Sequence, residues 1–169
     1  IEKAKGKYVM FIDCDMILSP NLIENCVSMI ESGDYLALHV PEIVLGQNFW
    51  SKVRRFERSF YNGTVIDGAR FFRKDKFVEA GGFDESYGGI GDWSEPDLAF
   101  RIKQLGYVLW FNPLAKLYHE PSRTGAYLKR DTCQARLSNY LLFSRRWVKP
   151  HWRHSLYKGF LYAYYGFKR

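Results

Sequence analysis

The chain has 169 residues, of which 47% are apolar and 25% charged, so it fits one folded domain and is not wholly disordered. No apolar run approaches the roughly 18 residues of a transmembrane helix, so this segment is not expected to span a membrane. The net charge of +7 is concentrated at the end, because residues 132–169 carry eight Lys or Arg and no acid. Any anionic partner is therefore expected at the tail.

The cysteine content indicates the compartment. Three cysteines are an odd number, and their spacing is not that of metal ligands, so a disulfide framework is not expected. Free thiols are typical of a reducing compartment, and the sequence therefore predicts a cytoplasmic protein.

Segments with strand-like and helix-like hydrophobic periodicity alternate along the first 120 residues, which predicts an α/β fold. Ser19 and Pro20 have the residue types of a helix N-cap and first helical position, and Gly33 is expected to end that helix. The expected elements are a strand at 7–12, a helix at 22–30, a strand at 35–44, an amphipathic helix at 49–60, a strand at 68–72, a loop at 80–91, a helix at 94–105 and strands at 108–111 and 115–118.

Two of these helices have a distinct apolar face. In the helix at 49–60 one face is apolar and the other carries Arg and Glu side chains. In the helix at 94–105 the side chains expected to point inward are Leu98, Ala99, Ile102 and Leu105, with Gly106 closing the helix.

Asp13 and Asp15 follow the first buried strand. Ligands of open α/β sheets gather at the carboxyl ends of strands, and carboxylates spaced in this way can share a divalent cation. The alternative is structural, with both acids capping the next helix or solvating the turn. The pair is a candidate metal site.

A second acidic cluster, Asp92-Trp93-Ser94-Glu95-Pro96-Asp97, opens the helix at 94–105. Ser94 and Asp97 match a capping box, which explains Asp97 structurally. Glu95 beside Trp93 suits a general base that acts on a sugar hydroxyl, because sugar rings pack on aromatic faces. The alternative is an acidic first turn favoured by the helix dipole.

His119 follows the last strand of this region and is either a packed side chain or a metal ligand. Imidazole suits Mn²⁺ somewhat better than Mg²⁺.

The ordered motifs resemble family-2 glycosyltransferases, which have the A-type nucleotide-sugar transferase fold. The matching stretches are Tyr8-Val9-Met10-Phe11-Ile12-Asp13-Cys14-Asp15, Gly68-Ala69-Arg70-Phe71-Phe72-Arg73, Gly81-Gly82-Phe83-Asp84-Glu85 and Glu95-Pro96-Asp97-Leu98-Ala99-Phe100-Arg101. The resemblance covers about residues 1–120 and implies inverting, metal-dependent transfer of a sugar from a nucleotide-sugar donor to a hydroxyl on a glycan or lipid-linked acceptor, as in polysaccharide biosynthesis.

The resemblance also implies roles for individual residues. Asp13 and Asp15 would bind Mn²⁺ or Mg²⁺ and the donor diphosphate, with His119 as a third metal ligand. Gly81 and Gly82 would border the donor sugar, with Asp92 and Trp93 near the donor or acceptor. The family's acidic element falls on residues 94–101, where Ser94 replaces a common acid, so the base stays open between Glu95 and Asp97.

Family members begin with a nucleotide-binding region of about 80–100 residues that precedes the D-x-D strand, and this chain starts just before that strand. We therefore expect residues 1–125 to form the acceptor-side part of the catalytic domain and residues 126–169 a helical extension. The tail from Arg145 to Arg169 holds seven Lys or Arg and eight aromatics. It is expected either to dock peripherally on an anionic membrane or to pack on the body.

Two other functions fit parts of the sequence. A haloacid-dehalogenase-like phosphatase also has D-x-D after an apolar strand, but Met16-Ile17 stands where that class has a Gly-Thr or Gly-Val pair. A non-catalytic fragment that binds carbohydrate or a membrane is the other alternative. Nucleic-acid binding is not expected, since the body is nearly neutral.

Overall fold

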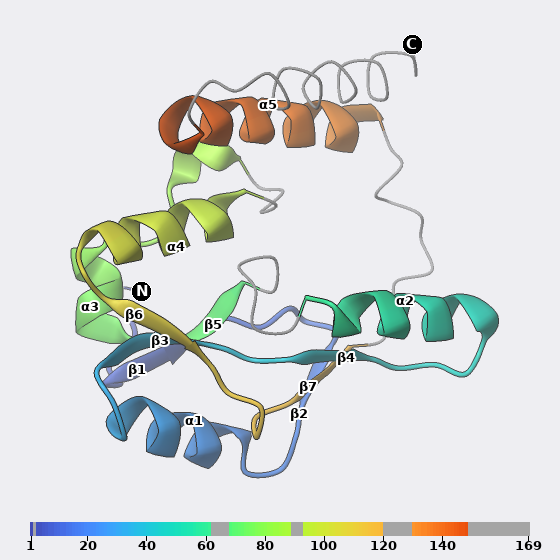
Figure 1. Ribbon diagram of the computed structural model, residues 1–169, viewed down its shortest axis with the longest axis horizontal. Helices are drawn as coiled ribbons and strands as arrows, with labels where there is room; N and C mark the ends of the chain where they lie inside the picture. The colour runs from blue at the N-terminus through green and yellow to red at the C-terminus, as the bar shows by residue number, and fades with distance from the viewer. Residues whose placement is uncertain (2, 62–67, 89–92, 120–129, 149–169) are drawn as a thin grey trace. The chain divides into compact units, whose positions relative to one another are not determined.

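The computed structural model describes residues 1, 3–61, 68–88, 93–119 and 130–148. The chain divides into two compact units, Ile1–Gly82 with Leu98–Ser122 and Phe83–Asp97 with Arg123–Arg169. Strands and helices alternate along the chain (Figure 1), which confirms the α/β class. The elements are β1 (Tyr8–Met10), β2 (Met16–Leu18), α1 (Leu22–Glu31), β3 (Tyr35–His39), β4 (Glu42–Val44), α2 (Phe49–Ser59), β5 (Ala69–Arg73), α3 (Lys74–Glu79), the 3₁₀ turn η1 (Glu85–Tyr87), α4 (Ser94–Gln104), β6 (Val108–Phe111), β7 (Leu117–His119) and α5 (Arg130–Trp147).

The first unit contains two mixed sheets. The four-stranded sheet has the order β1-β5-β3-β6, in which β5 is antiparallel to β1 and β3, and β3 is parallel to β6. The three-stranded sheet has the order β2-β7-β4, in which β7 is antiparallel to β2 and parallel to β4. Consecutive strands β1 and β2 thus belong to different sheets, as do β3 and β4.

Apolar side chains cover both faces of the four-stranded sheet because neighbouring residues of a strand point to opposite sides. Phe71 of β5 belongs to a buried cluster with Cys26 and Ile30 of α1. Its neighbour Phe72 instead packs against Phe77 of α3, with the ring centroids 5.0 Å apart. Helices α1 and α3 therefore pack on opposite faces of β5.

The start of α1 differs from the prediction, because Asn21 and not Ser19 is its N-cap. Asn21 has φ of 60°, a left-handed conformation that asparagine tolerates better than most residues. The Ser19 hydroxyl is used elsewhere, since it accepts a hydrogen bond of 3.2 Å from the backbone N–H of Lys116. Ser19 thus ties the entry of α1 to the segment that leads into β7.

The predicted strand at 35–44 is two strands. Pro41 has no backbone N–H to donate and interrupts the ladder, so β3 ends at His39 and β4 begins at Glu42. Because β4 pairs with β7 in the other sheet, this break passes the chain between the sheets.

Other expectations fare unevenly. Leu98, Ala99 and Ile102 are buried as predicted, but Leu105 is 47% exposed because it lies just past the end of α4. The short elements β2 and α3 were not predicted. Of the helical extension predicted at 126–169, residues 130–147 form α5, and residues 126–129 and 149–169 lie outside the described part.

The buried Asn112 side chain fixes the turn between β6 and β7. Its amide donates to the Asn25 carbonyl oxygen over 3.1 Å and lies 3.8 Å from the Cys26 sulfur. Burial raises the pKa of the Cys26 thiol to about 11, so this cysteine acts as a core residue.

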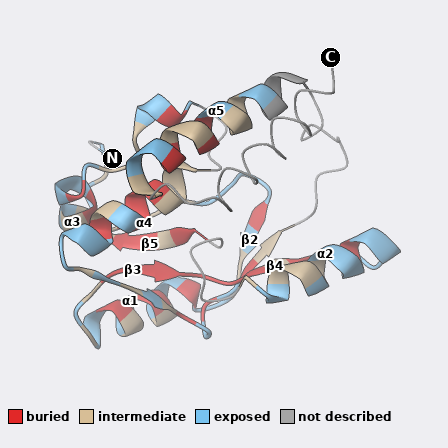
Figure 2. Ribbon diagram, turned by 45° about the horizontal axis from the view of Figure 1, so that its top comes forward, coloured by how far each residue is buried: buried red, intermediate tan, exposed pale blue. Residues whose placement is uncertain are grey.

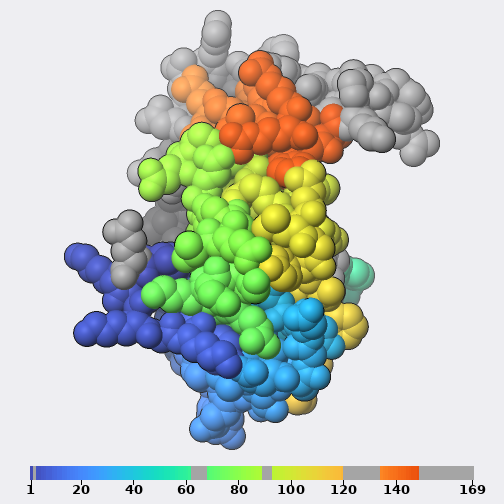
Figure 3. Space-filling view, turned by 90° about the vertical axis from the view of Figure 1, so that its left-hand side faces the viewer, coloured from blue at the N-terminus to red at the C-terminus, as the bar shows by residue number. Residues whose placement is uncertain are grey.

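On the face shown in Figure 3, the first residues of the chain lie against α3. The backbone N–H of Lys74 donates to the Lys7 carbonyl oxygen over 2.9 Å, and its ammonium group donates to the Ala4 carbonyl oxygen. A cavity of about 450 Å³ opens here, and none of the predicted site residues lines it. It is bordered by Gly6, Lys7, Arg73, Lys74, Asp75 and Val78.

In the second unit, α5 is joined to η1 by polar contacts. Arg146 of α5 pairs with Asp84, which also accepts a hydrogen bond of 2.8 Å from the backbone N–H of Ser86. The bonds from Ser86 and the Arg146 guanidinium lower the pKa of Asp84 to about 2.

Among the described helices, none is both long and apolar enough to cross a membrane.

Candidate functional site

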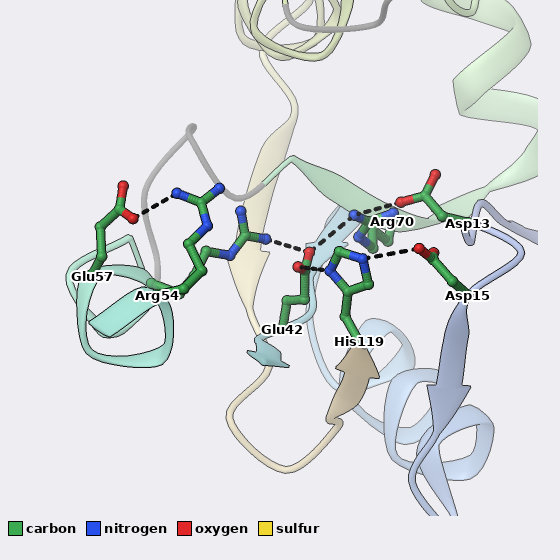
Figure 4. A network of polar contacts seen from close by, with 8 residues as sticks. Asp13, Asp15, Glu42, Arg54, Glu57, Arg70 and His119 are labelled. Atoms are coloured by element: carbon green, nitrogen blue, oxygen red, sulfur yellow. Dashed lines mark hydrogen bonds and ion pairs between the residues drawn. The ribbon is translucent and has the colours of Figure 1, made fainter. Parts of the chain in front are cut away.

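The polar cluster of the first unit forms where strands of both sheets end (Figure 4). Asp13 and Asp15 lie between β1 and β2, Glu42 begins β4, Arg70 lies in β5 and His119 ends β7. Glu42, Arg70 and His119 are placed by paired strands, and Asp13 and Asp15 by the connection between β1 and β2, so the cluster depends on the register of both sheets.

The D-x-D acids are exposed, and each contacts one neighbouring side chain. The side chain of Asp15 is 43% exposed, and its Oδ2 atom lies 3.2 Å from His119 Nε2. This contact follows from register, because Met16 is paired with His119 across β2 and β7. Asp13 is 64% exposed and lies 3.5 Å from an Arg70 nitrogen. The structure thus brings together Asp15 and His119, as the prediction of a shared site requires, and places Asp13 beside Arg70.

The His119 ring lies between two carboxylates. Its Nδ1 atom is 2.7 Å from Glu42 Oε1, while Nε2 faces Asp15. When Nδ1 carries the proton that it donates to Glu42, the lone pair of Nε2 points toward Asp15.

Glu42 is the residue that sequence analysis missed. Its side chain is only 6% exposed, and besides His119 it contacts Arg58 of α2 and Arg70, the latter at 3.3 Å. A buried carboxylate is stable only with such partners. The sequence signal was a single acid within the apolar run from Leu36 to Leu45.

The side chains of Asp15 and His119 suit a divalent cation that is also bound by substrate. Adjacent ligands of an octahedral ion with bonds of about 2.1 Å lie about 3 Å apart, close to the 3.2 Å that separates Asp15 Oδ2 and His119 Nε2. Metal-bound histidines also commonly donate their other ring N–H to a carboxylate, the position of Glu42. Among the described residues, no group of three or more His, Cys, Asp or Glu side chains has the arrangement of a metal site. Substrate oxygens would therefore have to complete the shell.

Gly81 and Gly82 form the turn after α3. Both have positive φ, 80° and 61°, a conformation that glycine adopts without strain. The Arg101 guanidinium holds this turn by donating to the carbonyl oxygens of Ala80 and Gly82, the latter over 2.7 Å. A Cβ on Gly82 would lie 3.1 Å from the Phe77 ring. These contacts account for both glycines structurally.

The second acidic cluster belongs to the second unit, where Asp97 and Glu95 have different environments. Asp97 is fully buried and accepts hydrogen bonds from the Tyr87 hydroxyl at 2.9 Å and from Trp147 Nε1 at 2.6 Å. Burial and the bond to Asp97 raise the pKa of Tyr87. Glu95 is half-buried.

Trp93 is half-buried and packs against the rings of Tyr140 and Phe143 in α5, 5.1 Å and 5.0 Å between centroids. Its ring is therefore less open to a sugar than the aromatic face that the sequence analysis expected beside Glu95. Asp92 lies outside the described residues.

Comparison with known proteins gives the family. The profile of glycosyl transferase family 2 matches residues 1–86, which include the D-x-D pair, Glu42, Arg70 and the two glycines of the turn. No curated protein matches the chain. The matched residues build the strands that carry the acids, and they cover half of the sequence. The chain therefore belongs to glycosyl transferase family 2.

Proposed function

We propose that this glycosyltransferase moves a sugar from a nucleotide-sugar donor to a hydroxyl acceptor with inversion at the anomeric carbon. The observation that carries the proposal is the array of Asp15, His119 and Glu42 beside Asp13, next to the carboxyl ends of β1 and β7, because ligands of α/β sheets bind at carboxyl ends of strands. Membership of the family supports transfer chemistry and speaks against the phosphatase alternative.

The exposed acids and His119 suit the binding of a donor diphosphate. Asp15 and His119 would hold Mn²⁺ or Mg²⁺ together with Asp13, and the diphosphate oxygens would complete the shell. When bound, the cation supplies positive charge that stabilises the departing nucleoside diphosphate. Arg70 adds a fixed positive charge beside Asp13.

Within this array Glu42 is a positioning residue for His119. Its contact with Nδ1 fixes the orientation of the ring and leaves Nε2 toward Asp15. Arg58 and Arg70 in turn hold the Glu42 carboxylate. The Glu42 carboxylate therefore holds the imidazole of His119 and the guanidinium groups of Arg58 and Arg70.

The proton of the acceptor hydroxyl would pass to Glu95. As that proton leaves, the acceptor oxygen forms the new bond to the anomeric carbon, and the bond between that carbon and the diphosphate breaks. Asp97 is the poorer candidate because its buried carboxylate already binds Tyr87 and Trp147. Its contacts support a structural role.

The test is Glu95→Gln in the protein as its gene encodes it. Transfer should fall at least about a hundredfold, as expected for loss of a general base, while calorimetric binding of donor with Mn²⁺ stays within about threefold. Glu85→Gln, in the same unit and exposed, is the matched control and should change neither.

Near wild-type transfer by Glu95→Gln would contradict this assignment and lead to Asp97→Asn. A wild-type protein that binds donor but transfers no sugar would instead be a binding module.

The acceptor class is also proposed from chemistry. A lipid-linked hydroxyl agrees with the basic and aromatic composition of residues 145–169. Most of that segment lies outside the described residues, so its contact with an anionic membrane stays a prediction.

A further inference from the structure

Helix α2 turns its polar side toward the protein. Arg55 donates from Nε to the Val44 carbonyl oxygen over 2.6 Å and from Nη2 to that of Gly46 over 2.7 Å. Arg58 pairs with the buried Glu42, and Ser51 is buried at the start of the helix. Amphipathic helices of soluble proteins ordinarily bury their apolar face, so the orientation of α2 is inverted.

The apolar side chains of α2 and of Phe60, which follows it, are exposed. The exposed fractions are 70% for Phe49, 76% for Trp50, 68% for Phe56 and 66% for Phe60. Figure 2 shows the outer part of α2 in pale blue, in contrast to the buried strand β3. Among the described residues, the ring contacts of these side chains are with each other, between Phe49 and Trp50 and between Phe56 and Phe60. Large exposed apolar patches mark interaction sites.

The size of this face argues against a second copy as its occupant. Four aromatic side chains of about 150–250 Å² each, which are 66–76% exposed, offer on the order of 550 Å² of accessible apolar surface. Stable protein interfaces bury about 800 Å² on each partner. Binding to a bilayer needs no such minimum area, because each inserted apolar side chain contributes separately.

The charges around this face complement an anionic surface. Lys52 and Arg54 are exposed next to the aromatic rings, and α2 as a whole carries four cations and one acid, Glu57. Arg54 pairs with Glu57 at 2.6 Å. Within the described part of the chain Lys52 has no acidic partner, so its charge can face phosphate groups. Aromatic rings beside exposed cations are typical of helices that lie in the membrane interface.

We propose that α2 docks this protein on an anionic lipid bilayer, with the rings of Trp50, Phe56 and Phe60 inserted at the headgroup level. This surface is separate from the sugar-transfer site, so the docking can fail or hold independently of the proposed reaction. The inner side of the same helix contacts Glu42 through Arg58. Docking would therefore bring the candidate donor site close to the membrane surface.

The experiment measures flotation of the full chain with vesicles of phosphatidylcholine alone and with 30% phosphatidylglycerol. The test variant replaces Trp50, Phe56 and Phe60 by Ser. Its partition into anionic vesicles should fall at least tenfold at 0.15 M salt, since each ring contributes about a tenfold factor when removed from water. Its melting temperature should match the wild type, because these rings are exposed.

The matched control replaces Ile23, Val78 and Leu114 by Ser, three apolar side chains that are also exposed but lie outside α2. Its vesicle partition should stay within about twofold of the wild type. Equal losses in both variants would show a general effect of surface apolarity and would overturn the assignment to α2.

Three further results would overturn the proposal. Unchanged binding of the test variant that disappears in 0.5 M salt would assign the membrane contact to charge alone. A wild-type dimer that the test variant dissociates would assign the face to a second copy. Loss of folding in the test variant, together with unchanged vesicle binding of Trp50→Ser, would assign it to packing within the chain.

If the triple variant does not fold, Trp50→Ser decides alone. It removes the most exposed ring of the helix and is expected to lower partition about tenfold with no change in melting temperature.

Discussion

Glu42 illustrates how one buried residue can organise an exposed site. Its carboxylate contacts His119, Arg58 and Arg70, which come from three separate elements. Two arginines compensate the buried charge, and the remaining oxygen is available to hold an imidazole ring. The precision of the Asp15–His119 pair therefore depends on a residue that need not touch substrate.

Replacing Glu42 by Gln should lower the affinity for Mn²⁺ about 10- to 100-fold, the usual effect of removing a carboxylate that orients a metal-bound histidine. Stability should fall by about 2 kcal/mol, because Arg58 and Arg70 lose the charge of the buried Glu42 carboxylate. Calorimetry with Mn²⁺ and nucleoside diphosphate measures the first effect, and urea denaturation the second.

Glu57→Gln is the control for that substitution. Glu57 also pairs with an arginine, Arg54, but on the exposed surface of α2. Affinity for Mn²⁺ should not change in Glu57→Gln. Equal affinity in the wild type and in Glu42→Gln would show that Glu42 does not orient His119.

The sequence indicates the exposed acids but not their buried support. Asp13 and Asp15 form a local pattern after an apolar strand, so they are predicted from neighbours alone. The contact of Glu42 with His119 spans 77 positions and arises only after β4 and β7 pair. Nothing within a local window shows that the acid after Pro41 faces a histidine.

At the scale of elements, η1 and α5 of the second unit are joined by a salt bridge whose acid has a lowered pKa. Asp84 in the folded state has a pKa of about 2, below the ordinary value of about 3.9. The unfolded chain therefore takes up the proton first as pH falls. The contribution of Asp84 to stability is complete above about pH 5 and is lost as pH drops toward 2.

The stability difference between the wild type and Asp84→Asn measures this effect. It should be about 1–2 kcal/mol at pH 5.5 and should nearly vanish by pH 2. Urea denaturation followed by tryptophan fluorescence at each pH gives both values. A difference that stays constant across this range would mean that the Asp84 carboxylate is not stabilised by Ser86 and Arg146.

Prediction of the elements succeeded where hydrophobic periodicity was long and failed where contacts across the fold decide. The helix at 94–105 has a repeated apolar face and was predicted nearly to its ends. Ser19 has the right residue type for an N-cap, but its hydroxyl binds Lys116 instead. The run 35–44 has one uniform pattern, yet Pro41 divides it between two sheets.

At the scale of the whole molecule, β3 is, with β5, one of the two inner strands of the four-stranded sheet. It pairs with β5 on one side and β6 on the other, and Leu36, Ala37 and Leu38 are at most 1% exposed. Hydrogen exchange of these amides requires the opening of the sheet, whereas strands at an edge exchange by local fraying.

Hydrogen-exchange mass spectrometry should therefore find the peptide over 35–39 among the last to exchange, with the edge strands β1 and β6 faster. The α2 peptide should exchange faster still, since one face of that helix is open to solvent. Exchange in β3 as fast as in β1 would contradict the strand order of the four-stranded sheet.

The family assignment and the α/β class were both accessible from sequence, because the motifs are short, ordered and tied to strand ends. The orientation of α2 was not. The amphipathic pattern of this helix does not by itself show which face packs on the protein. The bonds from Arg55 and Arg58 to β4 and to the residues next to it show that the polar side is inward.

The D-x-D acids also lie at the boundary between the two sheets. Asp13 follows β1 and approaches Arg70 of the four-stranded sheet, whereas Asp15 precedes β2 and contacts His119 of the three-stranded sheet. Cys14 alone separates the two attachments. A ligand bound by both carboxylates would therefore connect the two sheets, and its release would remove that connection. Under the proposed reaction, binding and release of the donor would therefore change the stiffness of this unit.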